Sequence, residues 1–301
     1  MDGILIIDKP EGPTSHDVVN RVRGILKTKK VGHTGTLDPF ATGVLVLLIG
    51  KATRLAQFLD KDEKEYEAAV RFGFETDTGD RMGNPRPSDQ APKLITIEQI
   101  ESAISQFRGE FEQTPPMFSA KKVDGKKLYE HARKGVEIKR KGVTVNISKL
   151  EIVSEPPALA GARTSKTDTV TLCVRCSAGT YIRTLAEDIG RSVGTAAHLI
   201  ELRRTCAGKF RVEDAATLDE LESAGPIRFL RSMNEAVAHL TEFILDSDRV
   251  ERTRNGLSTR VERDDLDDDA AVKMLDLHGN LIAVGIYDAS ERRVRPKIVL
   301  V

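Results

Sequence analysis

The feature that most constrains the fold is an uninterrupted apolar run, GVLVLLIG, at residues 43–50. A helix that crosses a membrane needs about 20 consecutive apolar residues, and this run is the longest apolar stretch in the chain. It is therefore too short to span a membrane, and it is typical of a strand buried inside a folded domain. We expect it to form a core strand.

Chain length and composition predict two folded domains. The chain has 301 residues, of which 40% are hydrophobic and 31% charged, whereas a typical domain has roughly 150 residues. This composition excludes a disordered or fibrous protein. Residues 1–10, MDGILIIDKP, lack the basic segment and the long apolar segment of a secretory signal, so we expect a cytoplasmic protein.

The three cysteines, Cys173, Cys176 and Cys206, are an odd number in a chain long enough to fold without disulfides. Cys173 and Cys176 form a C-x-x-C pattern within DTVTLCVRC, but the alternation of that segment predicts a strand, on which positions three apart face opposite sides. No second Cys/His pair with zinc spacing follows. We therefore expect a reducing compartment, no disulfide framework and no metal site.

Charge is balanced over the whole chain but not along it. The chain has 46 basic and 46 acidic residues, so its net charge gives no sign of a nucleic-acid partner. Residues 121–141, however, contain nine basic and three acidic side chains, which suits the binding of a polyanion. Residues 262–269, ERDDLDDD, form an acidic run that is typical of a solvated loop.

Capping patterns and periodicity predict a mixed α/β chain. A helix start is indicated at Thr14, ahead of an apolar face that begins at Val18, and capping boxes indicate further starts at Thr96 and Thr217. Strands are expected at residues 44–49, 66–74, 136–153 with a break near Gly142, and 170–175. After Leu245 the chain turns acidic and ends in the strand-like runs LIAVGIYD and PKIVLV, which predicts a small β domain.

The densest unusual segment is VGHTGTLDPFATGVL, at residues 31–45. Its glycines permit close backbone approach, an apolar strand follows, and Pro39 biases Asp38 toward an extended backbone. This arrangement would hold one carboxylate at the edge of a cleft, so Asp38 is the leading catalytic candidate. The rival interpretation, a phosphate-binding loop at residues 33–36, is disfavoured because no Gly-Lys-Ser/Thr follows and Asp38 places an anion where the phosphate would lie.

Further motifs surround this loop in a fixed order. They are KPEGPTS (9–15), KEYEAAVRFGFETDTGD (64–80), PPMFSAKKVDGKKLYEHAR (115–133), CSAGTYIRTLAEDIG (176–190) and AAHLIELRRT (196–205). Together with GHTGTLDPFATGVL, they resemble the motifs of the TruB family of tRNA pseudouridine synthases. The resemblance covers residues 3–210, and a weaker one links residues 246–301 to PUA-type RNA-binding domains.

The resemblance implies an α+β fold with two domains. Residues 1–245 are expected to form a pseudouridine synthase catalytic domain around a mixed, largely antiparallel sheet. A basic insertion that clamps RNA is expected at about residues 115–146. Residues 246–301 are expected to form a small β-rich, PUA-like RNA-binding domain.

The resemblance also assigns the site residue by residue. Asp38 falls on the nucleophilic aspartate of the family, Arg183 on the arginine that pairs with it, and Tyr66 on the active-site tyrosine. The substrate-binding positions are His33, which fills the gap left by the extruded base, Leu202, Lys9 and Tyr181. For Lys9, phosphate contact and support of the loop both stay open. The expected RNA-binding residues are Lys121, Lys122, Arg133, Lys139, Arg140, Lys141 and Arg203.

The activity that the resemblance implies is the isomerisation of uridine 55 in the T-loop of tRNA to pseudouridine. It proceeds by extrusion of the base and an aspartate-dependent break and re-formation of the glycosidic bond, without cofactor or metal. The expected partner is the T-stem and T-loop of tRNA, bound by a monomer that does not touch a membrane. Two alternatives stay open: a guide-RNA-dependent synthase of the box H/ACA type, and a tRNA-binding or tRNA-folding protein without catalysis.

Overall fold

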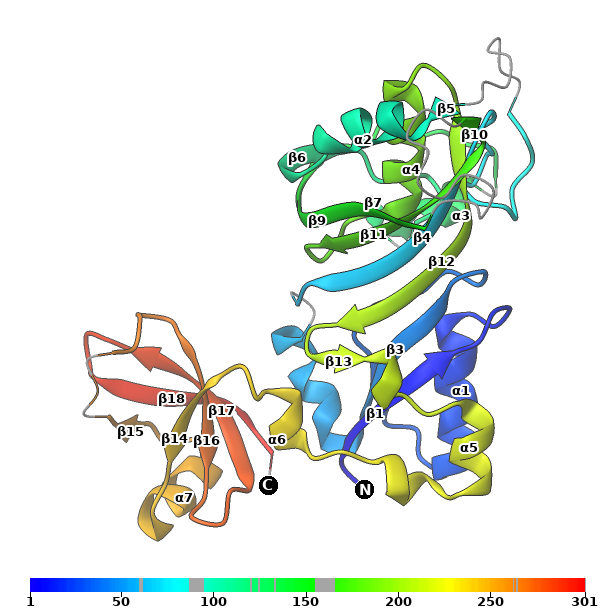
Figure 1. The fold of residues 1–301 in the computed structure, drawn as a ribbon. Helices are drawn as coiled ribbons and strands as arrows, with labels where there is room; N and C mark the ends of the chain where they lie inside the picture. The colour runs from blue at the N-terminus through cyan, green and yellow to red at the C-terminus, as the bar shows by residue number, and fades with distance from the viewer. Residues whose placement is uncertain are drawn as a thin grey trace.

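The computed structural model describes residues 1–59, 62–86, 95–119, 121–123, 125–132, 134–154, 166–261, 263 and 265–300. Within these ranges the chain forms a large domain around a nine-stranded sheet and a small domain around a five-stranded sheet. Figure 1 shows the small domain, coloured orange to red, beside the lower half of the large domain. The predicted α+β class, with a mixed sheet and a β-rich C-terminal domain, is confirmed.

Among the described strands, the large sheet is antiparallel at every pairing except that of β12 with β3. Its order is β1-β3-β12-β4-β11-β9-β6, with β2 beside β3 and β13 beside β12. The strands are β1 (Gly3–Lys9), β2 (Val31–His33), β3 (Thr42–Ile49), β4 (Lys64–Phe72), β6 (Gly109–Gln113), β9 (Val143–Ser154), β11 (Thr169–Cys176), β12 (Ala197–Ala207) and β13 (Phe210–Arg211). The middle of this order is therefore formed by β12, β4 and β11.

Helices cover the two halves of the large sheet separately. The main helices in the described part of this domain are α1 (Ser15–Leu26), α2 (Ile97–Ser105), α4 (Ile182–Ser192), α5 (Leu218–Ser223) and the 3-10 helix η1 (Gly50–Phe58). α2 and α4 pack with β4, β9 and β11, whereas α1 and α5 pack with β1 and β3. Short elements complete the domain: β5 (Ile95–Thr96), β7 (Lys122–Val123), β8 (Lys126–Lys127), α3 (Leu128–Ala132), β10 (Lys166–Thr167), η3 (Val212–Asp214), η4 (Pro226–Phe229) and α6 (Met233–Ala236).

The apolar run of the sequence is β3, as predicted, and it is buried on both faces. Leu45 and Leu47 pack toward α1 and α5, whereas Val44 and Val46 pack toward η1 and the small domain. Because successive side chains of a strand point to opposite faces, a strand covered on both sides has no polar face. This burial on both faces explains why the apolar run of β3 is not interrupted by polar residues.

Local sequence signals predicted the helix starts correctly and one strand incorrectly. Thr14, Thr96 and Thr217 are N-caps, and each closes a capping box with the residue three positions later. The strand expected at residues 136–153 is partly wrong, because β9 begins at Val143 and residues 136–142 form no regular element. Four of these residues are charged, so the segment has no alternating apolar face to bury.

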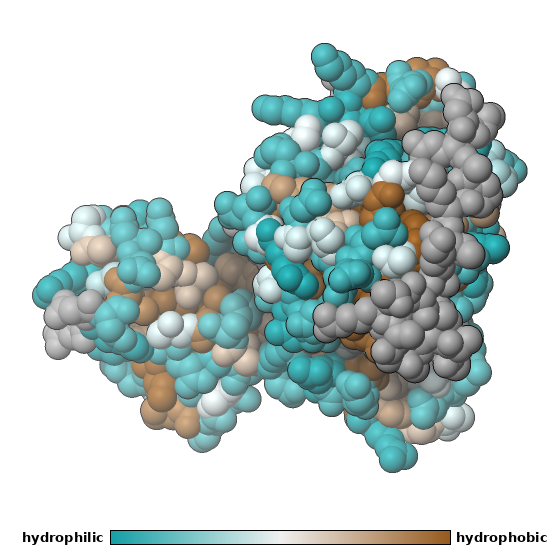
Figure 2. Space-filling view, turned by 45° about the horizontal axis from the view of Figure 1, so that its top comes forward, coloured by the Kyte–Doolittle hydropathy of each residue, from teal (hydrophilic) through white to brown (hydrophobic). Residues whose placement is uncertain are grey.

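The small domain consists of a sheet in the order β14-β16-β17-β18-β15 with one helix against it. Its elements are β14 (Thr241–Ile244), α7 (Ser247–Arg254), β15 (Thr259–Arg260), β16 (Ala271–Leu275), β17 (Leu281–Asp288) and β18 (Arg293–Val299). The sheet thus includes β14, which lies before the boundary expected after Leu245. Leu275 and Ile298 pack in one apolar cluster with Ile4 and Leu55 of the large domain. Figure 2 shows this domain as a lobe beside the larger body, with a mostly hydrophilic surface in that view.

Among the described helices, none combines the length and the hydropathy that a membrane span requires.

Candidate active site

Asp38 lies between β2 and β3 in the loop of residues 34–41, which we call the Asp38 loop. The hydroxyl of Ser15, at the start of α1, accepts a hydrogen bond from the backbone N–H of Leu37 at 2.8 Å and donates to the carbonyl of Leu37 at 3.0 Å. On the other side of Asp38, Nζ of Lys9 donates to the carbonyl of Pro39 at 3.3 Å and to that of Ala41 at 2.8 Å. The loop is therefore fixed by α1 before Asp38 and by β1 after it.

Directly after this loop, β3 approaches β12 very closely. Gly43 lies opposite Arg204 in the parallel register, and a Cβ at Gly43 would lie 2.2 Å from the carbonyl oxygen of Arg204. Gly43 also has a φ of 99°, which side chains other than glycine rarely adopt. Glycine is thus required at this position, and it allows the Asp38 loop to lie beside β12.

Arg183, near the start of α4, holds the Asp38 carboxylate through two nitrogens. Nε lies 3.0 Å from Oδ2, and Nη2 donates to Oδ1 at 3.3 Å. The guanidinium also donates to the carbonyl of Thr78 at 2.8 Å and to that of Phe118 at 2.7 Å. These two hydrogen bonds to the backbone fix the orientation of the guanidinium. The Arg183 side chain is 7% exposed and that of Asp38 is 33% exposed. The carboxylate is therefore the accessible member of a bidentate pair.

A second carboxylate, Asp80, lies on the far side of Arg183. Its Oδ2 is 3.8 Å from Nη1 of Arg183, and its Oδ1 accepts hydrogen bonds from Oγ1 of Thr78 at 2.8 Å and the N–H of Met82 at 2.9 Å. Asp80 is buried and holds this turn against the guanidinium. Asp80 was not among the predicted site residues, although it is the last residue of the motif at residues 64–80.

Burial raises the pKa of Asp38 above the usual value of a carboxyl group, and the negative charge of Asp80 contributes to this rise. The positive charges of Arg183 and Lys9 lower the pKa of Asp38 and so oppose the effect of burial. Burial also lowers the pKa of Lys9, to about 8. The charge state of the Asp38 carboxyl group therefore depends on two opposing effects. Burial favours the neutral form, and the positive charges of Arg183 and Lys9 favour the ionised form.

Tyr66 and Leu202 place an aromatic ring and an aliphatic wall on one face of the sheet. Tyr66 of β4 lies opposite Arg204 of β12, and two positions away Leu202 lies opposite Ala68. Both side chains pack in the same apolar cluster as Leu37 of the Asp38 loop. Burial raises the pKa of Tyr66, while the positive charge of Arg204 lowers it. The phenol is thus neutral near pH 7.

The start of α4 is fixed by a side chain from β6. Gln113 donates from Nε2 to the carbonyl of Tyr181 at 3.1 Å, and its Oε1 accepts from the N–H of Tyr181 at 2.8 Å. Gln113 is buried, and Tyr181 is the N-cap of α4. Gln113 therefore fixes the backbone from which Arg183 projects two residues later. No sequence signal distinguishes this glutamine from others.

Three other predicted residues have partners within the protein. Nδ1 of His33 accepts a hydrogen bond from the N–H of Gly35 at 3.3 Å, which holds the ring beside the Asp38 loop. Lys9 is fully buried, and its Nζ donates to backbone carbonyls, which favours support of the loop over phosphate contact. Arg203 donates two hydrogen bonds to the carboxylate of Asp8, at 2.7 and 3.1 Å, so its guanidinium is paired within the protein.

The predicted basic segment is exposed at only some of its positions. Lys139 and Lys141 are exposed, and neither forms an ion pair with a described residue. Arg140 is half-buried, donates to the carbonyl of Pro115 at 3.1 Å and lies 3.5 Å from the carboxylate of Glu137. Lys121 is half-buried. Arg133 and the side chain of Lys122 lie outside the described residues.

Arg204 is the residue near the site that the sequence analysis most clearly missed. Its side chain is 2% exposed, and it donates from Nε to the carbonyl of Val44 at 2.7 Å and from Nη2 to that of Gly35 at 3.1 Å. Strand alternation was the available signal, because it places Arg204 on the same face as Leu202 and Arg203 on the opposite face. Because Leu202 was expected to line the pocket, strand alternation would have indicated that Arg204, and not Arg203, also faces the site.

The three cysteines are free thiols, and Cys176 packs in the same apolar cluster as Tyr66 and Leu202. Burial raises the pKa of Cys176 to about 12, so this thiol is protonated near pH 7. Within the described ranges, no group of three or more His, Cys, Asp or Glu side chains could hold a metal ion.

Comparison with known families gives two matches that together span most of the chain. Residues 23–182 match the model of the TruB family pseudouridylate synthase N-terminal domain, and residues 183–250 match that of the tRNA pseudouridylate synthase B C-terminal domain. The protein named tRNA pseudouridine synthase B from Solibacter usitatus is 52% identical over 223 residues, which cover 74% of this chain and 72% of the relative. Its namesake from Geobacillus thermodenitrificans is 42% identical over 265 residues, covering 87% and 86%.

Solved structures show the same fold over 99% of this chain. An H/ACA RNP bound to a substrate RNA containing 2′-deoxyuridine matches with a TM-score of 0.73 and 25% identity, and a Cbf5-Nop10-Gar1 complex matches with a TM-score of 0.72 and 27% identity. In both cases the match covers 85% of the other chain. The similarity therefore includes the small domain as well as the large one.

Proposed function

This chain belongs to the TruB family of pseudouridylate synthases, and from that premise we propose that it isomerises uridine 55 in the T-loop of tRNA to pseudouridine. Pseudouridine synthesis in tRNA is the activity of the relatives that are 40 to 52% identical to it over most of its length. The observation that carries the proposal is the bidentate pair of Asp38 and Arg183, which leaves one partly exposed carboxylate in a fixed orientation.

The proposed reaction needs no electron donor or acceptor. The bond between N1 of uracil and C1′ of ribose breaks, the uracil turns, and a bond forms between C5 and C1′. C5 loses a proton and N1 gains one, so the product is an isomer of the substrate. The requirements are an ionised carboxylate, a group that handles the C5 proton, and a pocket that retains the free uracil.

Asp38 starts this reaction at the sugar, as the nucleophile at C1′ or as the base at C2′. Arg183 keeps the carboxylate ionised and aimed, because its fork binds both oxygens and its other donors bind fixed carbonyls. This arrangement supports its role as a catalytic partner rather than as a surface arginine.

Tyr66 and Leu202 enclose the extruded uracil in this proposal. Tyr66 stacks on the base and relays the C5 proton, because its phenol oxygen accepts that proton as its own O–H proton passes to solvent. Leu202 packs near the ring. His33 lies directly before the Asp38 loop and fills the gap that the extruded base leaves in the RNA. Tyr181 lies two residues before Arg183 in the chain. Their support is their place around Asp38 and the motifs in which they lie.

The partner in this proposal is the T-stem and T-loop of tRNA. The exposed ammonium groups of Lys139 and Lys141 suit contact with phosphates. Arg140 and Arg203 have partners within the protein, so we assign them less weight in RNA binding than the sequence analysis did.

A second candidate is a synthase directed by a guide RNA. It is favoured by the likeness to the H/ACA RNP structure at 25% identity, but the relatives named tRNA pseudouridine synthase B are much closer in sequence. A third candidate is a tRNA-binding protein without catalysis, which is disfavoured by the intact pair of Asp38 and Arg183.

The test is tritium release from an unmodified tRNA transcript labelled at uridine C5, with the purified chain alone. The proposal predicts release of one label per tRNA, and loss of release when uridine 55 is replaced by cytidine. Release that persists after this replacement would assign another uridine. No release from a folded transcript that binds the protein would favour the guide-dependent or the non-catalytic alternative.

A further inference from the structure

Arg183 must project from a fixed backbone if its guanidinium is to hold Asp38 in one orientation. The helix that carries it, α4, begins without the usual support, because its N-cap is Tyr181 and no side-chain cap hydrogen bond forms there. Four other described helices, α1, α2, α5 and α6, begin after a threonine or serine that closes a capping box. The start of α4 therefore depends on contacts from another element.

Gln113, the last residue of β6, supplies these contacts. Its amide pairs with both backbone groups of one residue, because Nε2 donates to the carbonyl of Tyr181 at 3.1 Å and Oε1 accepts from its N–H at 2.8 Å. Gln113 is 1% exposed, so both hydrogen bonds are shielded from solvent. We call this pair of hydrogen bonds the Gln113 bracket. An amide can form it because it carries a donor and an acceptor side by side.

The chain that follows Gln113 holds the other end of Arg183. The carbonyl of Phe118 accepts a hydrogen bond from Nη2 of Arg183 at 2.7 Å. β6 and residues 114–118 thus contact both the start of α4 and the guanidinium that projects from its first turn. Loss of the Gln113 bracket would therefore move the backbone of Arg183 relative to the acceptors that fix its guanidinium.

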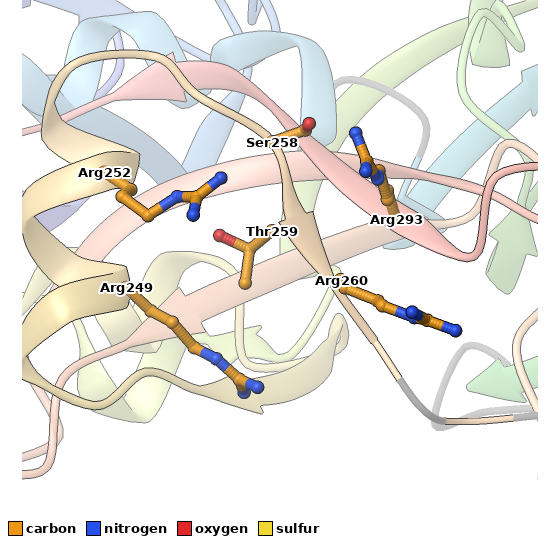
Figure 3. A pocket seen from close by; sticks show the side chains of 6 residues that line it. All are labelled: Arg249, Arg252, Ser258, Thr259, Arg260 and Arg293. Carbon is orange, nitrogen blue, oxygen red and sulfur yellow. The ribbon is translucent and has the colours of Figure 1, made fainter.

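The small domain offers a comparison, because several of its arginines have no such supports. Arg252 of α7, Arg260 of β15 and Arg293 of β18 line a hollow (Figure 3) and are exposed. Among the described residues, none accepts a hydrogen bond from these three guanidinium groups or forms an ion pair with them. Because an arginine can remain unsupported in this protein, the fixed orientation of Arg183 needs supports of its own.

We propose that Gln113 is a positioning residue for catalysis: by pairing with the backbone of Tyr181, it fixes Arg183 in the orientation that binds both oxygens of the Asp38 carboxylate. Gln113 acts through Arg183 and has no separate role at the reacting atoms. The inference rests on the proposed function, because that function supplies the reaction in which Asp38 takes part.

Gln113→Met is the first test, since methionine keeps the length of the side chain and removes both hydrogen bonds. We expect kcat for pseudouridine formation to fall roughly tenfold, because a small displacement of a group that orients the carboxylate affects the chemical step. The affinity for tRNA should stay close to that of the wild type, because the amide is buried. Single-turnover kinetics and equilibrium binding measure the two quantities, and an unchanged kcat would overturn the inference.

Thr167→Val is the matched control. Oγ1 of Thr167 also pairs with both backbone groups of one residue, donating to the carbonyl of Thr169 at 2.7 Å and accepting from its N–H at 3.0 Å. Thr167 is buried as well, and Thr169 lies opposite Arg71, five positions along β4 from Tyr66. Thr167→Val should lower the melting temperature and leave kcat unchanged. Equal loss of kcat in this variant and in Gln113→Met would indicate general destabilisation and overturn the inference.

A double-mutant cycle with Arg183→Lys tests whether Gln113 acts through Arg183. The lysine variant has already lost the bidentate pair with Asp38, so no orientation of that pair remains to be fixed. Gln113→Met should therefore lower kcat less than about twofold in the Arg183→Lys background. Effects that multiply in the double variant would show an independent role of Gln113 and overturn the inference.

Gln113→Glu is a second variant for the case in which methionine prevents folding. A protonated carboxyl group can donate to the carbonyl of Tyr181 and accept from its N–H, whereas an ionised one can only accept. The kcat of this variant, divided by that of the wild type, should therefore fall as the pH rises. A ratio that stays near one at every pH would overturn the inference.

The charge state of Asp38 gives a readout that does not require activity. The positive charges of Arg183 and Lys9 lower the pKa of Asp38, whereas burial and the negative charge of Asp80 raise it. If Arg183 is displaced in Gln113→Met, its charge should lower this pKa less. The pKa of Asp38 should therefore be higher in Gln113→Met than in the wild type, and unchanged in the control variant.

The closing experiment is an NMR titration of the full chain labelled with ¹³C at its aspartate carboxyl groups, in which Asp38→Asn identifies the resonance of Asp38. The result expected is a higher pKa of Asp38 in Gln113→Met and the wild-type value in Thr167→Val. The same pKa in Gln113→Met and the wild type would overturn the inference. Absence of tritium release from tRNA with the wild type would instead refute the proposed function, and the titration would still decide on Gln113.

Discussion

One buried arginine of the large domain and two exposed arginines of the small domain have opposite surroundings. Arg183 in the large domain is buried, and its guanidinium binds both oxygens of Asp38 and two backbone carbonyls. Arg252 and Arg293 in the small domain are exposed, and no carboxylate of the described chain pairs with them. The first arrangement fixes the orientation of the Asp38 carboxylate, and the second exposes the positive charge of Arg252 and Arg293 to solvent.

This difference separates what each region contributes to function. A guanidinium with every donor directed to a fixed acceptor stabilises one orientation of a reacting group, and its loss affects the chemical step. Exposed guanidinium and ammonium groups attract phosphates, and their loss affects affinity and its salt dependence. Substitutions in the two regions should therefore change different measured quantities.

Among the arginine and lysine substitutions that test this difference, the largest effect is expected for Arg183→Lys. Lysine keeps the positive charge but cannot bind both carboxylate oxygens and two carbonyls in one plane. We expect kcat for pseudouridine formation to fall on the order of 100-fold, about 2.7 kcal/mol of activation free energy, with tRNA affinity nearly unchanged. Single-turnover kinetics and equilibrium binding measure the two quantities.

A lysine variant with normal kcat would show that Arg183 contributes charge alone, and the comparison between the two domains would fail. Thermal melting of the variant is the control, since a buried lysine without partners destabilises the fold.

The next effect is on the pH dependence of the chemical step. The proposed reaction starts from an ionised Asp38, so we expect kcat to fall as the pH decreases through the pKa of Asp38. Because burial raises this pKa, the acid limb should lie above the value of an ordinary carboxyl group. Asp80→Asn removes a negative charge that contributes to the rise, so it should move the limb to lower pH.

A limb that moves to higher pH in Asp80→Asn would contradict this assignment of the titrating group. Measuring kcat at saturating tRNA, rather than kcat/KM, keeps changes in RNA binding out of the profile.

The smallest effect on chemistry is expected in the basic segment of the large domain. Lys139 and Lys141 are exposed, so K139A/K141A should leave kcat unchanged, weaken tRNA binding several-fold and reduce the salt slope by about one to two units. Arg140→Ala should instead lower thermal stability, because this side chain donates to the carbonyl of Pro115. An unchanged salt slope in the double variant would remove both lysines from the RNA interface.

The fold was predictable from sequence where the signal is local. Capping boxes at Thr14, Thr96 and Thr217 predicted helix starts, and the apolar run predicted β3, since both signals lie within a few residues of the element they describe. Residues 136–141 were wrongly predicted as strand, because four of them are charged and the segment has no alternating apolar face to bury. The expected break near Gly142 agrees with the start of β9 at Val143.

The site was predictable only in part. Asp38 was indicated by its own loop, and Arg183 and Tyr66 by motifs, but their mutual geometry depends on strand register. Arg203 was expected to bind RNA, yet its carboxylate partner Asp8 lies 195 positions away in the chain. Asp80, Gln113 and Arg204 support the site through contacts of the same kind, which no local pattern shows.

We propose that the carboxylate of Asp38 performs the chemistry and that the rest of the protein binds and orients the tRNA. Asp38→Asn tests it most directly, since the amide keeps the shape of the side chain and removes its charge. This variant should release no tritium above background from C5-labelled tRNA, and its tRNA affinity and melting temperature should be close to those of the wild type. Release at the wild-type rate would contradict it.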